Sequence, residues 1–181
     1  MLKDFNWSTL IAVGLLAGSV QVATGVVMYL AGIYFVPWGI FVSLLVLLLC
    51  IVFGTLWYRV SALKGRISYG QALIVGIVIS VSTGVVYAVY NIISISFFYP
   101  NFLEEMITVS LATASQRTPE FIAAMRESIT TKTIAFSNLI RLSVLGTILS
   151  VFASFFLRNK HKPLSVPVER PTSREVHFSR R

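Results

Sequence analysis

The chain has 181 residues, of which 56% are hydrophobic and 12% are charged, and this composition excludes an ordinary soluble domain. Its net charge of +8 does not indicate nucleic-acid binding, because the basic residues gather in one short loop and in the C-terminal tail. The single cysteine, Cys50, excludes an internal disulfide and a cysteine-based metal site. We therefore expect a protein whose partner is the lipid bilayer and not a nucleic acid.

Four apolar runs are long enough to cross a bilayer, whose hydrocarbon core of about 30 Å takes roughly 20 helical residues. The predicted spans are about 9–33, 37–58, 72–99 and 134–157. A secretory signal peptide is the competing interpretation of the first run, but that run is too long and its basic flank too weak. The sequence predicts an all-α fold: a four-helix transmembrane bundle in residues 1–157 with an outer amphipathic helical segment at 100–133, and a disordered basic tail at 158–181.

The first two spans each carry small residues along one side. A tight turn at Pro37 makes these spans antiparallel neighbours. We expect the face of the first span to pack against the third span or against a second copy, although glycine is also simply frequent in membrane helices. The first face consists of Gly14, Gly18, Gln21, Gly25, Met28 and Gly32, and the second of Gly39, Ser43, Cys50 and Gly54.

Charge outside the spans predicts the topology. The loop after the second span carries Arg59, Lys64 and Arg66 with no acid, and the tail after Leu157 carries seven further Lys and Arg. The segment between the third and fourth spans instead mixes basic residues with four glutamates. Because basic residues beside spans stay in the cytoplasm, we expect both termini there.

The third span, free of charge from Ala72 to Phe98, also has a polar and small face. We expect this face to pack closely, with Tyr87 and Asn91 forming hydrogen bonds between helices. The residues of the face are Gly76, Ser80, Thr83, Tyr87, Asn91 and Ser94, and Gly76, Ser80, Gly84 and Ala88 repeat every four residues along its edge.

A family resemblance rests on the residues around this span, which read Gly65-Arg66-Ile67-Ser68-Tyr69-Gly70-Gln71-Ala72, then Gly76, and close with Tyr99-Pro100-Asn101-Phe102. They resemble the bacterial membrane family catalogued as domain of unknown function 4199. The resemblance covers most of residues 1–160 and implies a four-helix bacterial membrane protein, hence one in the cytoplasmic (inner) membrane. It implies no activity and no catalytic residue.

The outer segment reads as two short helices. Asn101 with Glu104 resembles a capping box, and an apolar stripe then predicts a helix on the membrane surface or across the bundle mouth. Thr118 followed by Pro119 restarts a helix that could run directly into the fourth span. We expect a lid or connector, with ligand binding as the alternative.

The fourth span contains Arg141, with Ser137 and Asn138 one turn earlier. An arginine inside a span is costly, so we expect it to point into the bundle, with Glu104 or Glu105 as counter-charges. The alternative is that it extends outward to the headgroups. The predicted intramembrane polar cluster is Arg141, Asn138, Asn91, Tyr87 and Gln21. Ser143, Gly146, Ser150 and Ser154 lie on another face, so this helix should contact two neighbours.

The sequence offers no enzyme chemistry. Both histidines, His161 and His177, lie in the tail, and no span contains an acid. We therefore expect no catalytic residue, metal or cofactor. Two functions remain open. The first is a structural or accessory protein that assembles, as a homo-oligomer or with a membrane-protein partner, through its small-residue faces. The second is a small transporter or channel subunit with a polar path around Gln21, Asn91 and Arg141.

Overall fold

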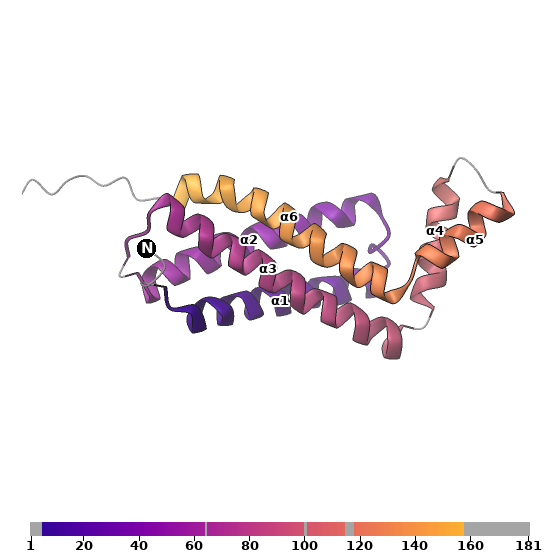
Figure 1. Cartoon of the computed structure of the whole chain (residues 1–181), viewed down its shortest axis with the longest axis horizontal. Coiled ribbons are helices and arrows are strands. Elements are labelled where there is room, and N and C mark those ends of the chain that lie inside the picture. Colours follow the sequence, from indigo (N-terminus) through magenta and orange to yellow (C-terminus); the bar gives the residue numbers. More distant parts are fainter. Residues whose placement is uncertain (1–4, 64, 100, 115–117, 158–181) are drawn as a thin grey trace, which may run out of the picture.

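The computed structural model describes residues 5–63, 65–99, 101–114 and 118–157, which form helices joined by turns, with no β-strand among them. The helices are α1 (Trp7–Leu30), α2 (Pro37–Ser61), α3 (Tyr69–Ile93), α4 (Phe102–Thr113), α5 (Pro119–Ser128) and α6 (Thr131–Leu157), shown in Figure 1. A π-helical turn, Ser94–Phe98, extends α3. Four helices are long and apolar enough to span a membrane: α1, α2, α3 with its extension, and α6. The prediction of an all-α, four-helix membrane bundle is confirmed.

The helix ends differ from the expected spans by a few residues. The first helix stops at Leu30, and Gly32 adopts a φ of 71° in the turn that follows, a conformation that favours glycine. Gly32 therefore belongs to the turn and not to the packing face of α1, which corrects its predicted place. The basic tail at 158–181 and Lys64 lie outside the described residues.

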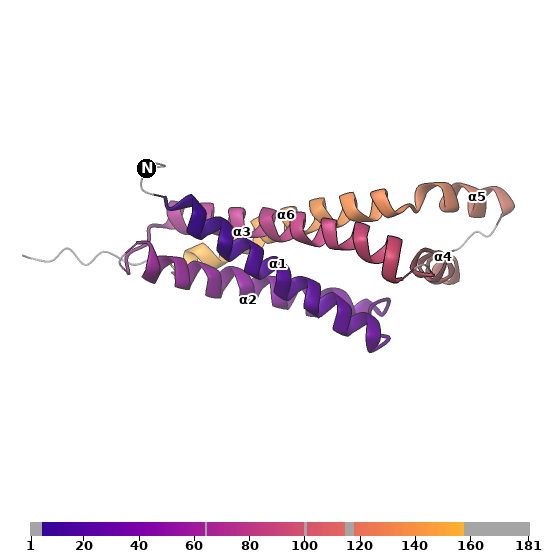
Figure 2. The same ribbon diagram turned by 90° about the horizontal axis from the view of Figure 1, so that it is seen from below.

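The ends of the spanning helices and the segments that connect them lie in two groups, one at each end of the bundle. The start of α1, the loop between α2 and α3, and the end of α6 lie together, while the 31–36 turn and α4–α5 lie at the other end (Figure 1). Toward that second end, α1 and α2 diverge from α3 and α6 (Figure 2). We call the end that carries α4 and α5 the outer end and the opposite one the inner end.

Helix α3 is the central element, because it packs against both α6 and α1. On the α1 side, a Cβ added to Gly18 would lie 2.6 Å from the Cβ of Val86, and one added to Gly25 would lie 2.8 Å from the hydroxyl of Tyr87. The glycine face of α1 thus packs on α3 within one chain. This close approach depends on the absence of side chains at these positions.

At the interface between α3 and α6, a glycine of one helix faces a serine of the other at two places, with the roles of the helices exchanged. Gly76 faces Ser150, and Gly146 faces Ser80. Each serine hydroxyl donates a hydrogen bond to the glycine carbonyl four residues earlier on its own helix, Ser80 to Gly76 at 2.7 Å and Ser150 to Gly146 at 2.6 Å. We call these four residues the glycine–serine lock. Because each hydroxyl is satisfied within its helix, the contact across the interface is steric packing.

Local contacts close the inner end. The Asn6 side chain caps α1, and its backbone N–H donates to the Tyr58 hydroxyl at 2.9 Å. Ser68 and Gln71 form a capping box at the start of α3. These bonds satisfy helix N-termini that would otherwise leave backbone donors unpaired.

At the outer end, α4 crosses the bundle axis, since it runs upright in Figure 1 and is seen end-on in Figure 2. Its first residue, Phe102, is buried against the rings of Tyr29, Tyr34 and Phe35. The predicted capping box is wrong, because the Asn101 side chain makes no capping bond and its backbone is helical rather than extended. Packing of Phe102, and not a cap, holds this helix start.

Helix α5 begins as predicted, with the Thr118 side chain accepting from the backbone of Phe121 and Pro119 in the first turn. It does not continue into the fourth span, because Ile129 is extended and a new helix starts at Thr131. An exposed ion pair between Arg126 and Glu104, 3.1 Å long, joins α5 to α4. The outer segment is therefore a separate helical pair seated on the bundle.

Candidate functional site

A cavity of about 270 Å³ lies between the α1–α2 pair and the α3–α6 pair, where these pairs diverge. Its lining begins at Gln21 and Ser43 in the spans and reaches Tyr34 and Val36 in the outer turn. The full lining is Gln21, Thr24, Gly25, Met28, Tyr34, Val36, Gly39, Ile40, Ser43, Tyr87 and Arg141. All four spanning helices contribute, so the cavity forms only when the bundle is assembled.

Gln21 and Ser43 form a polar contact between α1 and α2 in the wall of this cavity. The Gln21 amide nitrogen donates to both the hydroxyl and the carbonyl oxygen of Ser43, the second bond being 3.4 Å long. A carbonyl oxygen can only accept, so the amide nitrogen must be the atom that faces it. The Gln21 Oε1 is consequently left buried without a hydrogen-bond partner among the described residues. The pair joins α1 to α2 and leaves one polar atom unsatisfied.

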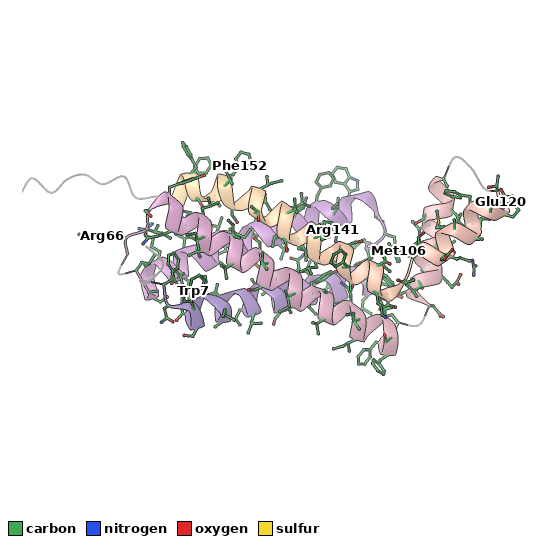
Figure 3. All side chains as sticks on the ribbon, viewed as in Figure 1. Trp7, Arg66, Met106, Glu120, Arg141 and Phe152 are labelled. Carbon is green, nitrogen blue, oxygen red and sulfur yellow. The ribbon has the colours of Figure 1, made fainter. Side chains whose placement is uncertain are left out.

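Arg141 lies on α6, between the middle of the bundle and its outer end (Figure 3). At about 1.5 Å per residue, Arg141 and Gln21 lie about 15 Å from the outer ends of their helices, and Tyr87 lies about as far from the end of the π-helical turn that extends α3, so they share one depth. The Arg141 side chain is half-buried, and it lines the cavity together with Tyr87. Within the described part of the chain, its guanidinium forms no hydrogen bond and no ion pair.

The structure brings together three of the five residues predicted as a polar cluster: Gln21, Tyr87 and Arg141. Asn91 lines a smaller neighbouring cavity of about 20 Å³ instead. The expected interhelical bond of Asn91 is wrong, because its amide donates to the Tyr87 carbonyl of its own helix at 2.9 Å. Asn138 is buried but lines neither cavity.

The predicted counter-charges of Arg141 are engaged elsewhere. Both carboxylate oxygens of Glu104 accept from Arg126, and Glu105 accepts from the Tyr29 hydroxyl at 3.2 Å. None of the residues that line the cavity is acidic. The expectation that Glu104 or Glu105 balances Arg141 is therefore wrong for this structure.

Sequence reasoning missed two of the cavity's hydroxyl groups. Ser43 was predicted only as a small residue for packing, and Tyr34 was assigned to no site, yet both line the cavity. Gln21 and Ser43 lie on either side of the 31–36 turn at similar distances along the chain. In an antiparallel hairpin such positions face each other, and this signal could have paired them.

Among the described residues, the inner half of the bundle is packed around apolar side chains. Below Gln21 and Ser43 the centre is filled by fully buried apolar side chains, which are Leu10, Leu47, Ile51, Val75, Ile79 and Leu142. All four spanning helices also meet there through close contacts at glycine, which involve Gly14, Gly54, Gly76 and Gly146. Packed side chains of the described residues therefore lie between the cavity and the inner end of the bundle.

The chemistry available in the cavity is hydrogen-bond donation and positive charge. Its polar tips are the guanidinium of Arg141, the hydroxyls of Ser43, Tyr34, Tyr87 and Thr24, and the amide of Gln21. The Thr24 hydroxyl donates to a backbone carbonyl of α1, so it is already engaged. Across the described ranges no group of three or more metal-ligating side chains occurs. The arrangement suits the binding of an electron-rich polar group.

Comparisons with known proteins identify a family without an assigned activity. No curated protein and no solved structure matches the chain. A family model described as "Protein of unknown function (DUF4199)" matches residues 12–159, which include all four spanning helices. This match confirms the resemblance drawn from the residues around α3. The chain belongs to this family of proteins of unknown function.

Proposed function

We propose that this membrane protein is a binding protein that receives a small polar molecule, or the polar end of a lipid, in the cavity between its two helix pairs. We further propose that it catalyses no reaction. The observation that carries the proposal is a cavity of about 270 Å³ that combines a half-buried arginine with several hydroxyls inside the spans. Cavities of this kind, with few polar groups in an apolar surround, are the usual sites of small ligands.

Binding fits the geometry better than conduction does. A channel or transporter needs a path to the other side of the membrane, whereas the inner half of this bundle is packed with apolar side chains. The polar residues imagined as a path are only partly brought together, since Asn91 bonds to its own helix and lines a smaller neighbouring cavity. A packed inner half supports a ligand that enters and leaves from one side.

An accessory role through the small-residue faces receives less support. The glycines of α1 and the glycine–serine lock of α3 and α6 are occupied by contacts within the chain. Assembly with a second copy or with another membrane protein would need a different surface. A binding protein that also acts as an accessory subunit is compatible with the cavity.

We propose that the protein lies in the cytoplasmic (inner) membrane of a bacterium with both termini in the cytoplasm. The described inner end carries Arg59 and Arg66, while the four glutamates of the described residues lie in α4 and α5 at the outer end. This distribution follows the bias of basic residues toward the cytoplasm. The cavity would then open toward the outer leaflet.

Cysteine labelling tests whether the cavity is accessible and closed. In a Cys50→Ala background, Ser43→Cys places a thiol in the cavity, and Thr55→Cys places one on the same helix at a position that is 1% exposed. We expect a water-soluble thiol reagent to modify Ser43→Cys from one face of the membrane only. Thr55→Cys should not react from either face, because packed side chains separate it from both.

Two results would overturn the proposal. Absence of labelling at Ser43→Cys would mean that no polar molecule reaches the cavity. Rapid labelling of both thiols from the outer face would indicate a passage and favour the channel. Thr55→Cys is the matched control because it changes one hydroxyl into a thiol on the same helix, as Ser43→Cys does.

A further inference from the structure

Arg141 is a cation inside the membrane-spanning bundle without a counter-ion among the described residues. The described carboxylates belong to Glu104, Glu105, Glu120 and Glu127, all in the outer helices α4 and α5. Glu104 pairs with Arg126 and Glu105 accepts from Tyr29. An arginine at this depth is costly unless a partner or water compensates its charge. The protein therefore retains a charge whose partner is not within the described chain.

The groups around Arg141 are suited to an anion. The cavity contains no acid, and its polar lining includes hydroxyls that can donate. Ser43 uses its oxygen to accept from Gln21, which leaves its hydroxyl hydrogen free to donate in turn. Tyr87, on the neighbouring helix α3, lines the same cavity as Arg141. An oxygen-rich anion placed there would receive a charge-assisted bond from arginine and neutral bonds from the hydroxyls.

We propose that this cavity is an oxyanion site, in which Arg141 binds the carboxylate or phosphate group of the ligand. This inference rests on the proposed binding function and names the chemical class of the ligand. The planar guanidinium presents paired donors that match two oxygens of such a group, a match that a lysine ammonium cannot reproduce. The cavity accommodates one oxyanion group, and any acyl chain of a lipid would lie outside it.

Two sources can supply this group: a soluble anion, or the headgroup of an anionic lipid. Both would enter from the outer end, where the cavity lining reaches Tyr34 and Val36 in the turn. A soluble anion would stabilise the protein in detergent, without any added lipid. A lipid headgroup would stabilise the protein only when the anionic lipid is present in the bilayer.

The test compares thermal unfolding of the whole chain in two arms. In detergent, inorganic phosphate and acetate are titrated against chloride at constant ionic strength. In lipid nanodiscs, phosphatidylglycerol is titrated into phosphatidylcholine. We expect one arm to stabilise the unaltered protein in a saturable way, and we expect Arg141→Gln and Arg141→Lys to raise the half-maximal concentration at least ~10-fold. Arg126→Gln, which removes an exposed outer arginine, should leave that concentration unchanged.

The outcomes separate this inference from the proposed function. If neither the soluble anions nor the anionic lipid stabilises the protein while Ser43→Cys still reacts from one face, the proposal of a binding cavity is retained and the oxyanion assignment is wrong. An effect that Arg126→Gln reduces as much as Arg141→Gln does would be general charge screening and would also overturn it. Both Arg141 variants should fold, because each removes or replaces a charge that has no partner in the described chain, and retained helicity by circular dichroism checks this.

Discussion

Ser80 of α3 and Gly146 of α6 lie directly opposite each other, so that a Cβ added to Gly146 would come within 2.5 Å of the Ser80 Cβ. Ser150 and Gly76 repeat this relationship with the helices exchanged, at 2.7 Å. Because α3 and α6 run in opposite directions, a Gly-x-x-x-Ser pattern on each places every serine over a glycine. The lock sets how closely α3 and α6 approach, and both helices contribute to the cavity walls.

The first prediction is that Gly146→Ala destabilises the bundle by about 1–3 kcal/mol, the usual cost of adding a methyl group to a packed interface. The new methyl group meets the Ser80 Cβ, which cannot move without moving the helix backbone. The free energy of unfolding can be measured by denaturant titration in mixed micelles.

A double-mutant cycle supplies the control for this prediction. Ser80→Gly removes the atoms that the new methyl group meets, at a cost of less than about 1 kcal/mol, because serine is already a weaker helix former than alanine. The combined variant Gly146→Ala with Ser80→Gly should therefore be more stable than the sum of the single changes predicts. If the two changes in the free energy of unfolding simply add, residues 80 and 146 do not interact.

The spans and the faces of the helices could be predicted from sequence because both are local properties. Runs of apolar residues identify the spans, and the spacing of Gly14, Gly18, Gln21 and Gly25 identifies one side of α1, which the structure buries. Gly32 fell outside this rule because the helix ended first, and a positive φ suited glycine to the turn.

The composition of the cavity could be predicted only in part, because it depends on choices between competing partners. Asn91 could bond across helices or to its own backbone, and it took the carbonyl one turn earlier. Glu104 could face Arg141 or an exposed arginine, and it paired with Arg126. Such choices depend on how helices are rotated and how far they diverge, which residue spacing does not specify.

The second prediction concerns topology. Arg66 and Glu120 are exposed and lie at opposite ends of the molecule (Figure 3). In a Cys50→Ala background, Glu120→Cys should react with a membrane-impermeant maleimide in intact cells, and Arg66→Cys only after the membrane is opened. The physical reason is the retention of basic segments in the cytoplasm. Labelling of Arg66→Cys in intact cells, with Glu120→Cys protected, would reverse the orientation and place the cavity mouth on the cytoplasmic side.

The last prediction separates stability from binding at Gln21 and Ser43. Ser43→Ala removes the hydroxyl acceptor but leaves the backbone carbonyl, so it should cost only about 0.6 kcal/mol, the average for hydrogen bonds between membrane helices. Gln21→Leu removes the same bond together with the unpaired Oε1, so the two effects oppose each other and stability should change by less than ~1 kcal/mol.

Ligand binding should be weakened more clearly than stability, because Gln21 and Ser43 both line the cavity that contains Arg141. Leucine at position 21 would replace a polar wall with an apolar one of similar size, and we expect weaker stabilisation by the anion or lipid found active in the titrations. The comparison is Val22→Leu on the same helix, since Val22 does not line the cavity. A Gln21→Leu protein that unfolds readily but responds normally to the ligand would show that Gln21 joins α1 to α2 and has no part in binding.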